Sequence, residues 1–539
     1  MPVGVVRSLA WIAGAAVIFA GTAERGLGQA GPLCTVEKAK LTSGLFEEFG
    51  GATSIEGDTA AVGAYGADYK GTSSGACYVF VRNGSTWTQQ GLLLASDGSV
   101  GDWLGFSVAI SGDTIAAGSP HHDVGFGDAG AVYVYTRSGT IWTEQAELLR
   151  PGGQIPQGNF GYDVAVQGHR LLVGSPEIQA VTAGSVHLFE RSGSTWTFKK
   201  KLVPNDGRPG HYFGARLALD GASALITAPG NSAAYVFVES TTWLQEAKLV
   251  ASTGFPGDVF GSSASLSLDR ALVGAVGAGA AYVFERSGSI WTETKELLAS
   301  DGTPQDNFGR SVALRGDVAV VGAFTKSDPE AASGAAYVFA RSGGSWTEVT
   351  KLVPGDLSAH DELGTSVAYD GQSILVGAGF ESGGKGAAYV FLPGGLGAVY
   401  CTAKANSCGT LPTIGWTGEP SASATSGFVV HAQNAKAGKA GLLLYTDAGR
   451  GNAPFAGGIL CLATNPLKRT LAVFDTVGTP GQCDGVLAFD MNAFAAGALG
   501  GNPLASLAIP GTQVNCQFWG RDTLGNALLS NALEYFVCE

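Results

Sequence analysis

The stretch that decides the fold is FGRSVALRGDVAVVGA at residues 308–323, followed by AYVF at residues 336–339. Two runs of small and β-branched residues flank an Arg-Gly-Asp turn, and a third run ends in aromatic residues. This pattern is typical of antiparallel strands joined by tight turns. A block of about 52 residues with these features is repeated seven times between residues 49 and 391. Repeats of this length indicate a solenoid, a propeller or an array.

Each block opens and closes in the same way. The opening step is Phe-Gly or Leu-Gly, at residues 49–50, 104–105, 160–161, 213–214, 260–261, 308–309 and 363–364. The aromatic strand reads CYVF, VYVY or VHLF in the first three blocks and AYVF in the last four, and in six blocks a strand with a tryptophan follows. Four antiparallel strands per block predict an all-β, seven-bladed β-propeller over residues 31–396.

The seventh block lacks its tryptophan strand, because Phe391 runs into Leu-Pro-Gly-Gly. A matching strand stands at the other end of the chain, where TVEKAKL at residues 35–41 is similar to TEQAELL at residues 143–149. The sequence therefore predicts that an N-terminal strand completes the last blade, which would leave no open sheet edge at the seam.

The Phe-Gly steps and the Val-Gly-Ala steps at residues 62–64, 273–275, 321–323 and 376–378 resemble the FG-GAP repeat. That repeat builds the seven-bladed propeller of integrin α-subunits and of many secreted bacterial proteins, so the resemblance implies a propeller with an adhesion-type or binding role. The DxDxDG calcium loop of integrins is absent. Turns such as residues 56–58 are too short to supply the oxygens that calcium prefers. Gly-Asp recurs at these turns, so residues 315–317 indicate a hairpin rather than an adhesion tripeptide.

The two ends of the chain differ from the repeats. Arg7, an apolar run at residues 9–20 and small residues allowing cleavage after Ala23 or Ala30 predict a signal peptide at residues 1–30. We therefore expect a protein that is secreted, on the cell surface or in the periplasm. No later segment is expected to cross a membrane. Residues 397–539 carry short strand-like runs and one expected helix at residues 491–499, and predict a small disulfide-braced β-sandwich-like domain.

Six of the eight cysteines fall in that C-terminal domain. An even set in an exported chain predicts three disulfides, whose pairing the sequence leaves open. The six are Cys401, Cys408, Cys461, Cys483, Cys516 and Cys538. Cys34 and Cys77 form a further candidate pair. The net charge of −13 argues against nucleic acid as a partner.

The longer, variable loops share one face of the predicted ring, where binding residues usually lie. The candidate ligand-binding residues on this face are Tyr65, Tyr69, Trp103, Phe126, Tyr212, Phe255, Phe324 and Phe380. The candidate metal-binding residues are His121, His122, Asp123, Asp97, Asp102, Asp301 and Asp306. The acid pairs of the inter-blade loops allow three interpretations. They could be calcium ligands, paired carboxylates for glycoside hydrolysis, or turn residues that keep the surface soluble.

No sequence motif for a nucleophile, a zinc protease or a phosphate loop is found. We therefore expect a non-catalytic, exported binding or adhesion-type protein that presents a propeller face to a glycan or a protein, without a cofactor other than calcium. Two alternatives stay open at this point. One is a hydrolase or lyase acting on extracellular polysaccharide, and the other is a structural protein of the cell envelope.

Overall fold

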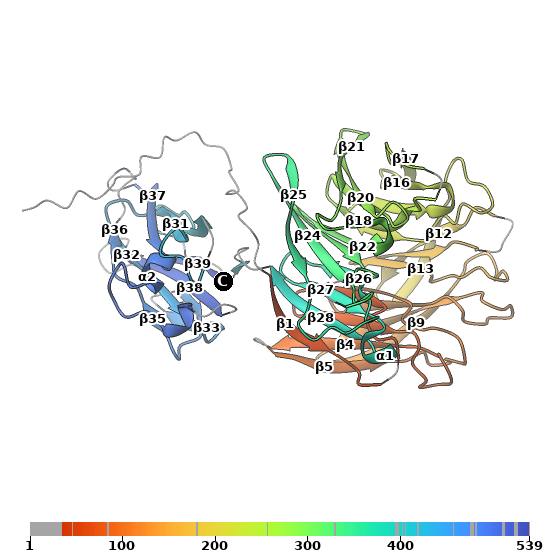
Figure 1. Ribbon diagram of the computed structural model, residues 1–539, viewed down its shortest axis with the longest axis horizontal. Helices are drawn as coiled ribbons and strands as arrows, with labels where there is room; N and C mark the ends of the chain where they lie inside the picture. The colour runs from red at the N-terminus through yellow and green to blue at the C-terminus, as the bar shows by residue number, and fades with distance from the viewer. Residues whose placement is uncertain are drawn as a thin grey trace, which may run out of the picture.

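The computed structural model describes residues 35–45, 47–83, 86–178, 182–255, 257–327, 330–393, 398–400, 403–404, 406–417, 420–455, 458–474, 479, 482–508, 512–521 and 527–537. The expected signal peptide at residues 1–30, and Cys34, Cys401 and Cys538, lie outside these residues. Two bodies are visible, one built from the repeats and one from the C-terminal residues (Figure 1). Among the described residues, no helix combines the length and apolarity needed to span a membrane.

The repeats form four-stranded antiparallel sheets, which we call blades 1 to 7. Blade 1 consists of β2 (Ala52–Glu56), β3 (Thr59–Ala64), β4 (Ala76–Asn83) and β5 (Thr86–Leu93), and blade 2 of β6 (Ser107–Ser111), β7 (Thr114–Ser119), β8 (Ala131–Ser138) and β9 (Ile141–Leu149). Blade 3 consists of β10 (Val164–Gln167), β11 (Arg170–Ser175), β12 (Ser185–Ser192) and β13 (Thr195–Leu202). Blade 4 consists of β14 (Leu217–Asp220), β15 (Ser223–Ala228), β16 (Ala233–Glu239) and β17 (Trp243–Leu249). The helix η1 (Pro229–Asn231) lies between β15 and β16.

Blades 5 to 7 follow the same order. Blade 5 consists of β18 (Phe260–Ser267), β19 (Arg270–Ala275), β20 (Ala280–Ser287) and β21 (Ile290–Leu297). Blade 6 consists of β22 (Phe308–Arg315), β23 (Val318–Ala323), β24 (Ala335–Ser342) and β25 (Ser345–Leu352). Blade 7 consists of β26 (Leu363–Tyr369), β27 (Ile374–Ala378), β28 (Ala387–Pro393) and β1 (Thr35–Leu41). The short helices η2 (Pro304–Asp306) and α1 (Glu381–Gly384) lie in loops.

The first strands of the blades lie side by side around a centre. Each contacts the first strand of the next blade, and β26 of blade 7 contacts β2 of blade 1. In blade 7 the fourth strand is β1, which pairs antiparallel with β28 from Thr35 opposite Pro393 to Leu41 opposite Ala388. The mostly β propeller fold expected from the repeats is therefore confirmed.

The Phe-Gly and Val-Gly-Ala steps form the contact between neighbouring blades. In blade 6 the Phe308 ring is buried edge-on against Tyr337 and Phe339. The carbonyl oxygen of Gly364, from the opening step of blade 7, lies so close to Gly322 that an added Cβ would stand 2.1 Å away. The Ser311 hydroxyl donates to the same carbonyl at 2.8 Å. Glycine is needed there because another backbone fills the space of a side chain.

The hairpin turn between the first and second strands carries the recurring Gly-Asp. Gly316 adopts φ +58° and Asp317 accepts a hydrogen bond from Arg270 Nη1 of the neighbouring blade at 2.9 Å. In blade 2, Arg137 Nε donates to the turn residue Asp113 at 2.7 Å and its guanidinium stacks on Trp142. The Arg-Gly-Asp tripeptide therefore lies in a structural hairpin turn, as the sister blocks predict.

The C-terminal body contains two larger sheets and a hairpin. Its elements are β29 (Ala398–Tyr400), β30 (Thr413–Thr417), β31 (Val429–Ala435), β32 (Ala440–Thr446), β33 (Arg450–Phe455), β34 (Gly458–Leu462), β35 (Lys468–Arg469), β36 (Val473–Phe474), β37 (Gly485–Asp490), α2 (Met491–Ala495), η3 (Ala505–Ala508), β38 (Gln513–Arg521) and β39 (Ala527–Phe536). A six-stranded sheet centred on β38 and the three-stranded sheet β30-β31-β37 bury one common apolar core. The helix α2 is shorter than expected and is capped by the Asp490 carboxylate.

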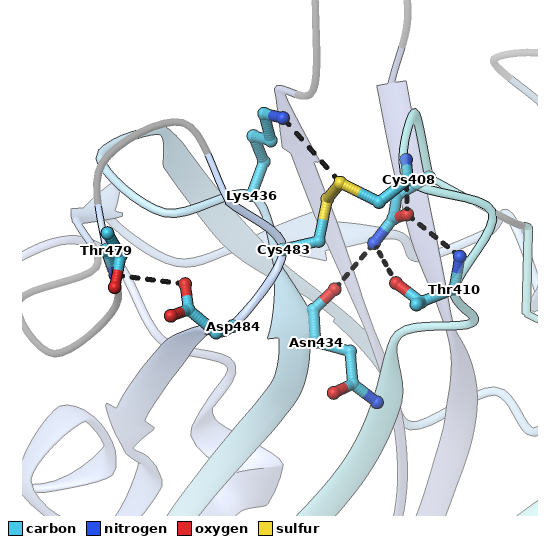
Figure 2. Close-up of a disulfide and its surroundings, with 8 residues drawn as sticks. Cys408, Thr410, Asn434, Lys436, Thr479, Cys483 and Asp484 are labelled. Atoms are coloured by element: carbon cyan, nitrogen blue, oxygen red, sulfur yellow. Dashed lines mark hydrogen bonds between the residues drawn. A yellow bond between two sulfur atoms is a disulfide. The ribbon is translucent and has the colours of Figure 1, made fainter.

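One disulfide joins Cys408 to Cys483, which are 75 residues apart (Figure 2). The loop that carries Cys408 is held by the Asn406 side chain. The Asn406 amide nitrogen donates to the carbonyl oxygen of Asn434 at 2.8 Å and to Thr410 Oγ1 at 2.7 Å. Cys461 is also disulfide-bonded. A closed loop of this length restricts the unfolded chain and so stabilises the folded domain.

Two cysteine predictions are wrong. Cys516 carries a free thiol inside the C-terminal core, so three disulfides do not form among the six cysteines of this domain. Cys77 is also a free, buried thiol, which excludes its pairing with Cys34. Its place in the aromatic strand is filled by Ala or Val in the other blades, and its side chain packs between blades 1 and 2 as a small apolar group.

Candidate binding site at the mouth of the central channel

The first strands enclose a central channel. A cavity of about 420 Å³ within it is lined by residues from all seven blades. The chain enters every first strand from the face that carries the long loops, so the residues around each Phe-Gly step stand at the mouth of the channel. Backbone repetition fixes where these residues lie, while their side chains differ from blade to blade.

The residue before each Phe-Gly or Leu-Gly step adopts the left-handed conformation in all seven blades, and none of the seven is glycine. Their φ angles lie between +47° and +60°. The seven residues are Glu48, Trp103, Asn159, Tyr212, Val259, Asn307 and Glu362. This conformation costs a non-glycine residue about 1–2 kcal/mol. The strain recurs because the turn that leads into the first strand of each blade requires this conformation. Strained residues of this kind cluster at functional sites, and here their variable side chains lie at the channel mouth.

An arc of aromatic rings follows one side of the mouth. The Tyr65 ring lies 5.4 Å from Trp103 and 5.9 Å from Phe106, measured between ring centroids. The arc continues from Phe106 to Tyr162 at 5.0 Å, and Trp103 also contacts the His121 ring at 4.2 Å. These residues come from blades 1, 2 and 3. All are only partly buried, so ring surface remains open to a ligand.

Two arginines continue the arc. The Arg216 guanidinium lies over the Tyr162 ring at 5.4 Å, and the Arg310 guanidinium lies over Phe324 at 5.7 Å. Within the described residues, neither guanidinium forms an ion pair; Arg216 donates to the carbonyl of Ala215. Burial and the positive charge of Arg216 lower the pKa of Arg310. Two partly desolvated cations close to one another favour an anionic group between them.

Carboxylates stand at the edge of this cationic region. Burial raises the pKa of Tyr65, and the nearby Glu48 carboxylate adds to the rise. Burial raises the Glu362 pKa, against the opposing effect of His360 and Arg310. The mouth therefore offers aromatic faces, two guanidinium groups and flanking carboxyl groups, a combination suited to a polar ligand with flat apolar faces.

Asp163 interrupts a regular pattern deeper in the channel. Its position is occupied by Ser107, Ser263, Ser311 and Ser366 in blades 2, 5, 6 and 7, each donating to a glycine carbonyl of the next blade. The Asp163 carboxylate instead accepts from the backbone N–H of Leu217 at 2.7 Å. Burial raises the Asp163 pKa to about 6, although Arg216 and the backbone bond oppose the shift.

This raised pKa predicts a pH-dependent stability. An acid whose pKa is higher in the folded protein lowers the free energy of unfolding as pH rises from about 4 through 6, because the folded state must then hold a partly desolvated charge. We expect Asp163→Asn to stabilise the protein at pH 8 by about 1–3 kcal/mol. The gain should shrink toward pH 4, where both side chains are neutral.

Thermal unfolding midpoints of the parent and Asp163→Asn proteins between pH 4 and 8 would measure this effect. Asp220→Asn, which removes a carboxylate at the far end of β14, is the control. A stability difference that does not vary with pH would contradict a raised pKa for the Asp163 carboxyl group.

The eight aromatic candidates fall into two groups. Tyr65, Trp103 and Phe324 gather at the channel mouth. Tyr212, before the Phe-Gly step of blade 4, is partly buried and also stands at the mouth. Tyr69 is bonded through its hydroxyl to Tyr78, and the rings of Phe126, Phe255 and Phe380 are 50%, 73% and 41% exposed elsewhere on the loops. Five residues of the channel were not among the candidates predicted from the sequence: Phe106, Tyr162, Arg216, Arg310 and Asp163. Comparing the residues that follow each Phe-Gly step would have found them, because there the repeat varies most.

The metal candidates also separate. His121 bonds to Asp128 and contacts Trp103, His122 bonds to Asp102, and the Asp123 carboxylate accepts from the backbone N–H of Asp128. The three neighbours therefore do not share one site. Asp301 and Asp306 are paired with the ammonium group of Lys326, so a cation of the protein already lies between them.

The fold and its channel define a repeat β-propeller with a candidate ligand site at the mouth. The FG-GAP repeat family matches residues 37–80, 87–135, 196–237, 243–288, 291–339 and 346–391, about half of the chain. The protein belongs to this family. A comparison with curated proteins finds no match.

Matches to solved structures have low identity and low TM-scores. The virginiamycin B lyase of Staphylococcus aureus is 12% identical with a TM-score of 0.44, over 67% of this chain and 98% of that one. The periplasmic gluconolactonase of Pseudomonas aeruginosa is 16% identical with a TM-score of 0.39, over 57% and 86% of the two chains. At these values the likeness carries no inference about activity.

Proposed function

We propose that this protein is an exported binding protein whose channel mouth takes an acidic glycan. The observation that carries the proposal is the continuity of the aromatic arc with Arg216 and Arg310, neither of which has an ion-pair partner among the described residues. Aromatic faces stack against the C–H faces of sugar rings, and guanidinium groups bind carboxylates or sulfates through paired hydrogen bonds.

Export is part of this proposal. The expected signal peptide at residues 1–30 and the disulfide between Cys408 and Cys483 support it, because structural disulfides persist in oxidising compartments. N-terminal sequencing of the protein recovered from its natural source would test the cleavage expected after Ala23 or Ala30. An intact N-terminus would contradict export by this route.

Removing either arginine should weaken binding strongly. We expect Arg216→Ala and Arg310→Ala each to lose about 10- to 100-fold in affinity, since a hydrogen-bonded charge pair contributes about 1.5–3 kcal/mol. Binding of uronate-containing, sulfated and neutral oligosaccharides, measured by calorimetry on the full chain, provides the readout. Arg310→Lys should recover only part of the loss, because an ammonium group cannot form the paired contact.

Matched controls are available on the same face. Arg208 is exposed on an inter-blade loop and is not among the cavity-lining residues, and Phe255 is an exposed aromatic outside the arc. Arg208→Ala and Phe255→Ala should bind as the parent does. Equal losses in Arg208→Ala and Arg310→Ala, or equal affinity for neutral and acidic oligosaccharides, would overturn the proposal.

A second candidate function rests on Asp163. A carboxyl group with a pKa of about 6 inside a channel suits proton transfer near neutral pH, which fits a hydrolase or lyase acting on polysaccharide. Incubation of the parent and Asp163→Asn proteins with the bound oligosaccharide separates the two functions. Product formation that disappears in Asp163→Asn would support an enzyme, whereas unchanged oligosaccharide would support a binding protein.

A further inference from the structure

A recurring triad braces the long-loop face of three blades. The tyrosine of the third strand donates to a loop aspartate, and the residue opposite that tyrosine on the fourth strand is a lysine that pairs with the same aspartate. The three sets are Tyr235, Asp206 and Lys248 in blade 4, Tyr337, Asp301 and Lys351 in blade 6, and Tyr389, Asp356 and Lys40 in blade 7. The lysine nitrogen lies 2.5, 2.9 and 2.7 Å from the carboxylate in these sets.

Blade 2 keeps the tyrosine and the aspartate but has no lysine. Tyr133 donates to Asp97 Oδ1 at 2.6 Å, and the residue paired with Tyr133 on the fourth strand is Glu147. A carboxylate therefore replaces the cation that neutralises the equivalent aspartate in the other three blades. The Asp97 and Glu147 carboxylates repel one another, so a positive charge between them would be stabilising.

Blade 5 shows how the repeat avoids this clash. It also has a glutamate in the fourth strand, Glu296, but Thr253 replaces the loop aspartate. The Tyr282 hydroxyl donates to Glu296 at 2.9 Å, and only one carboxylate remains. Of these five blades, blade 2 alone brings both carboxylates together.

An imidazole completes the blade 2 cluster. The His122 side chain is 9% exposed, and its Nδ1 lies 3.0 Å from Asp102 Oδ2. Its Nε2 faces Asp97 Oδ2 at 3.6 Å and Glu147 Oε1 at 3.9 Å, beyond hydrogen-bond distance from both. The three potential ligand atoms all lie within 4.8 Å of one another.

These separations suit one metal ion. With metal–ligand bonds of about 2.1 Å, the ligand atoms of a tetrahedral site stand roughly 3.4 Å apart, so small side-chain movements would close the cluster onto an ion. Asp102 would orient His122 through Nδ1, an arrangement that fixes the tautomer of a metal-binding histidine. An imidazole nitrogen with two carboxylates suits zinc or manganese better than calcium, which prefers oxygen ligands alone.

We propose that Asp97, His122 and Glu147 bind a divalent zinc or manganese ion, which takes the place of the lysine ammonium found in blades 4, 6 and 7. The ion would join the loop before β6, the loop after β7 and the fourth strand of blade 2. Its role would be to brace blade 2 beside the channel mouth, because the His121 ring next in sequence contacts Trp103 of the aromatic arc.

The test is titration of the metal-free full chain with zinc chloride and with manganese chloride, followed by calorimetry and by thermal unfolding. We expect one strong site in the parent and a higher unfolding midpoint with metal. Glu147→Lys rebuilds the triad of the other blades, and should bind at least about 100-fold more weakly while keeping a metal-free midpoint at or above that of the parent.

His122→Gln should lose the same binding event. Lys351→Ala, which disturbs the equivalent triad of blade 6, should leave it unchanged. Equal metal binding by the parent and Glu147→Lys would overturn the proposal, as would the absence of binding by the parent at millimolar metal. The glycan proposal does not depend on this result, because its arginines lie in blades 4 and 6.

Discussion

A chain that begins at residue 42 is expected to lose the stable, monomeric propeller. Its deletion removes β1, which supplies the fourth strand of blade 7 and pairs with β28 along its length. Leu41 is 3% exposed in the core shared by blades 7 and 1. Lys40 pairs with Asp356 at 2.7 Å and lies over the Tyr389 ring. Without β1, the edge of β28 is open and nothing in the sheet links the first repeat to the last.

We expect the unfolding midpoint to fall by at least about 10 °C, or the protein to self-associate through the open edge, since every kcal/mol lost lowers the midpoint of a large domain by a few degrees. Circular dichroism and size-exclusion chromatography of residues 42–539 and residues 31–539 would measure both effects. The longer chain, which keeps β1, is the control.

A synthetic peptide of residues 31–43, added to the shortened chain, should restore the midpoint by completing blade 7 in trans. This rescue distinguishes loss of the strand from general damage at the N-terminus. A shortened chain that stays monomeric with an unchanged midpoint would show that the ring does not depend on β1.

Gly322→Ala is expected to destabilise the propeller by about 3–5 kcal/mol or to prevent folding, because overpacking against backbone has no easy relief. The new Cβ would stand 2.1 Å from the carbonyl oxygen of Gly364 and 2.4 Å from the Ser311 hydroxyl. The two blades would have to separate where their first strands meet. Since Gly322 does not adopt a positive φ, the cost would come from crowding and not from backbone strain.

Gly316→Ala is the matched control in the same blade. Gly316 lies in the hairpin turn at φ +58°, and nothing approaches within 4 Å of an added Cβ. Its cost should be about 1–2 kcal/mol, the penalty of a left-handed alanine. Guanidinium unfolding of both variants gives the comparison. Similar losses would show that blade contact does not set the requirement for glycine at residue 322.

Blade 4 shows that this contact can be spaced differently. Thr227 takes the place of the glycine there, and the opening step of blade 5 lies farther away, with the ideal Cβ position of Gly261 at 3.2 Å from Thr227 Cβ. The Thr227 hydroxyl is buried and has no hydrogen-bond partner among the residues that the structure describes. The repeat thus tolerates a side chain where the neighbouring blade moves aside, at the cost of an unsatisfied polar group.

Residues of the fold were predictable wherever the signal is local. The strands, the Gly-Asp hairpin turns and the pairing of residues 35–41 with the last aromatic strand follow from alternation, turn chemistry and repetition. Cysteine pairing was less predictable. Cys77 and Cys516 occupy strand positions inside apolar cores, and a count of cysteines cannot distinguish a buried thiol from a disulfide partner.

The sequence by itself determined that this is a repeat β-propeller of the FG-GAP type with a separate C-terminal domain, because each blade is encoded by short-range patterns written many times. Only the tertiary structure decided which side chains meet. Tyr65, Trp103, Tyr162, Arg216 and Arg310 come from five blades and are brought to one channel mouth by the arrangement of the first strands. The close approach of Asp97, His122 and Glu147 likewise depends on two loops and a strand packing together, which no local pattern specifies.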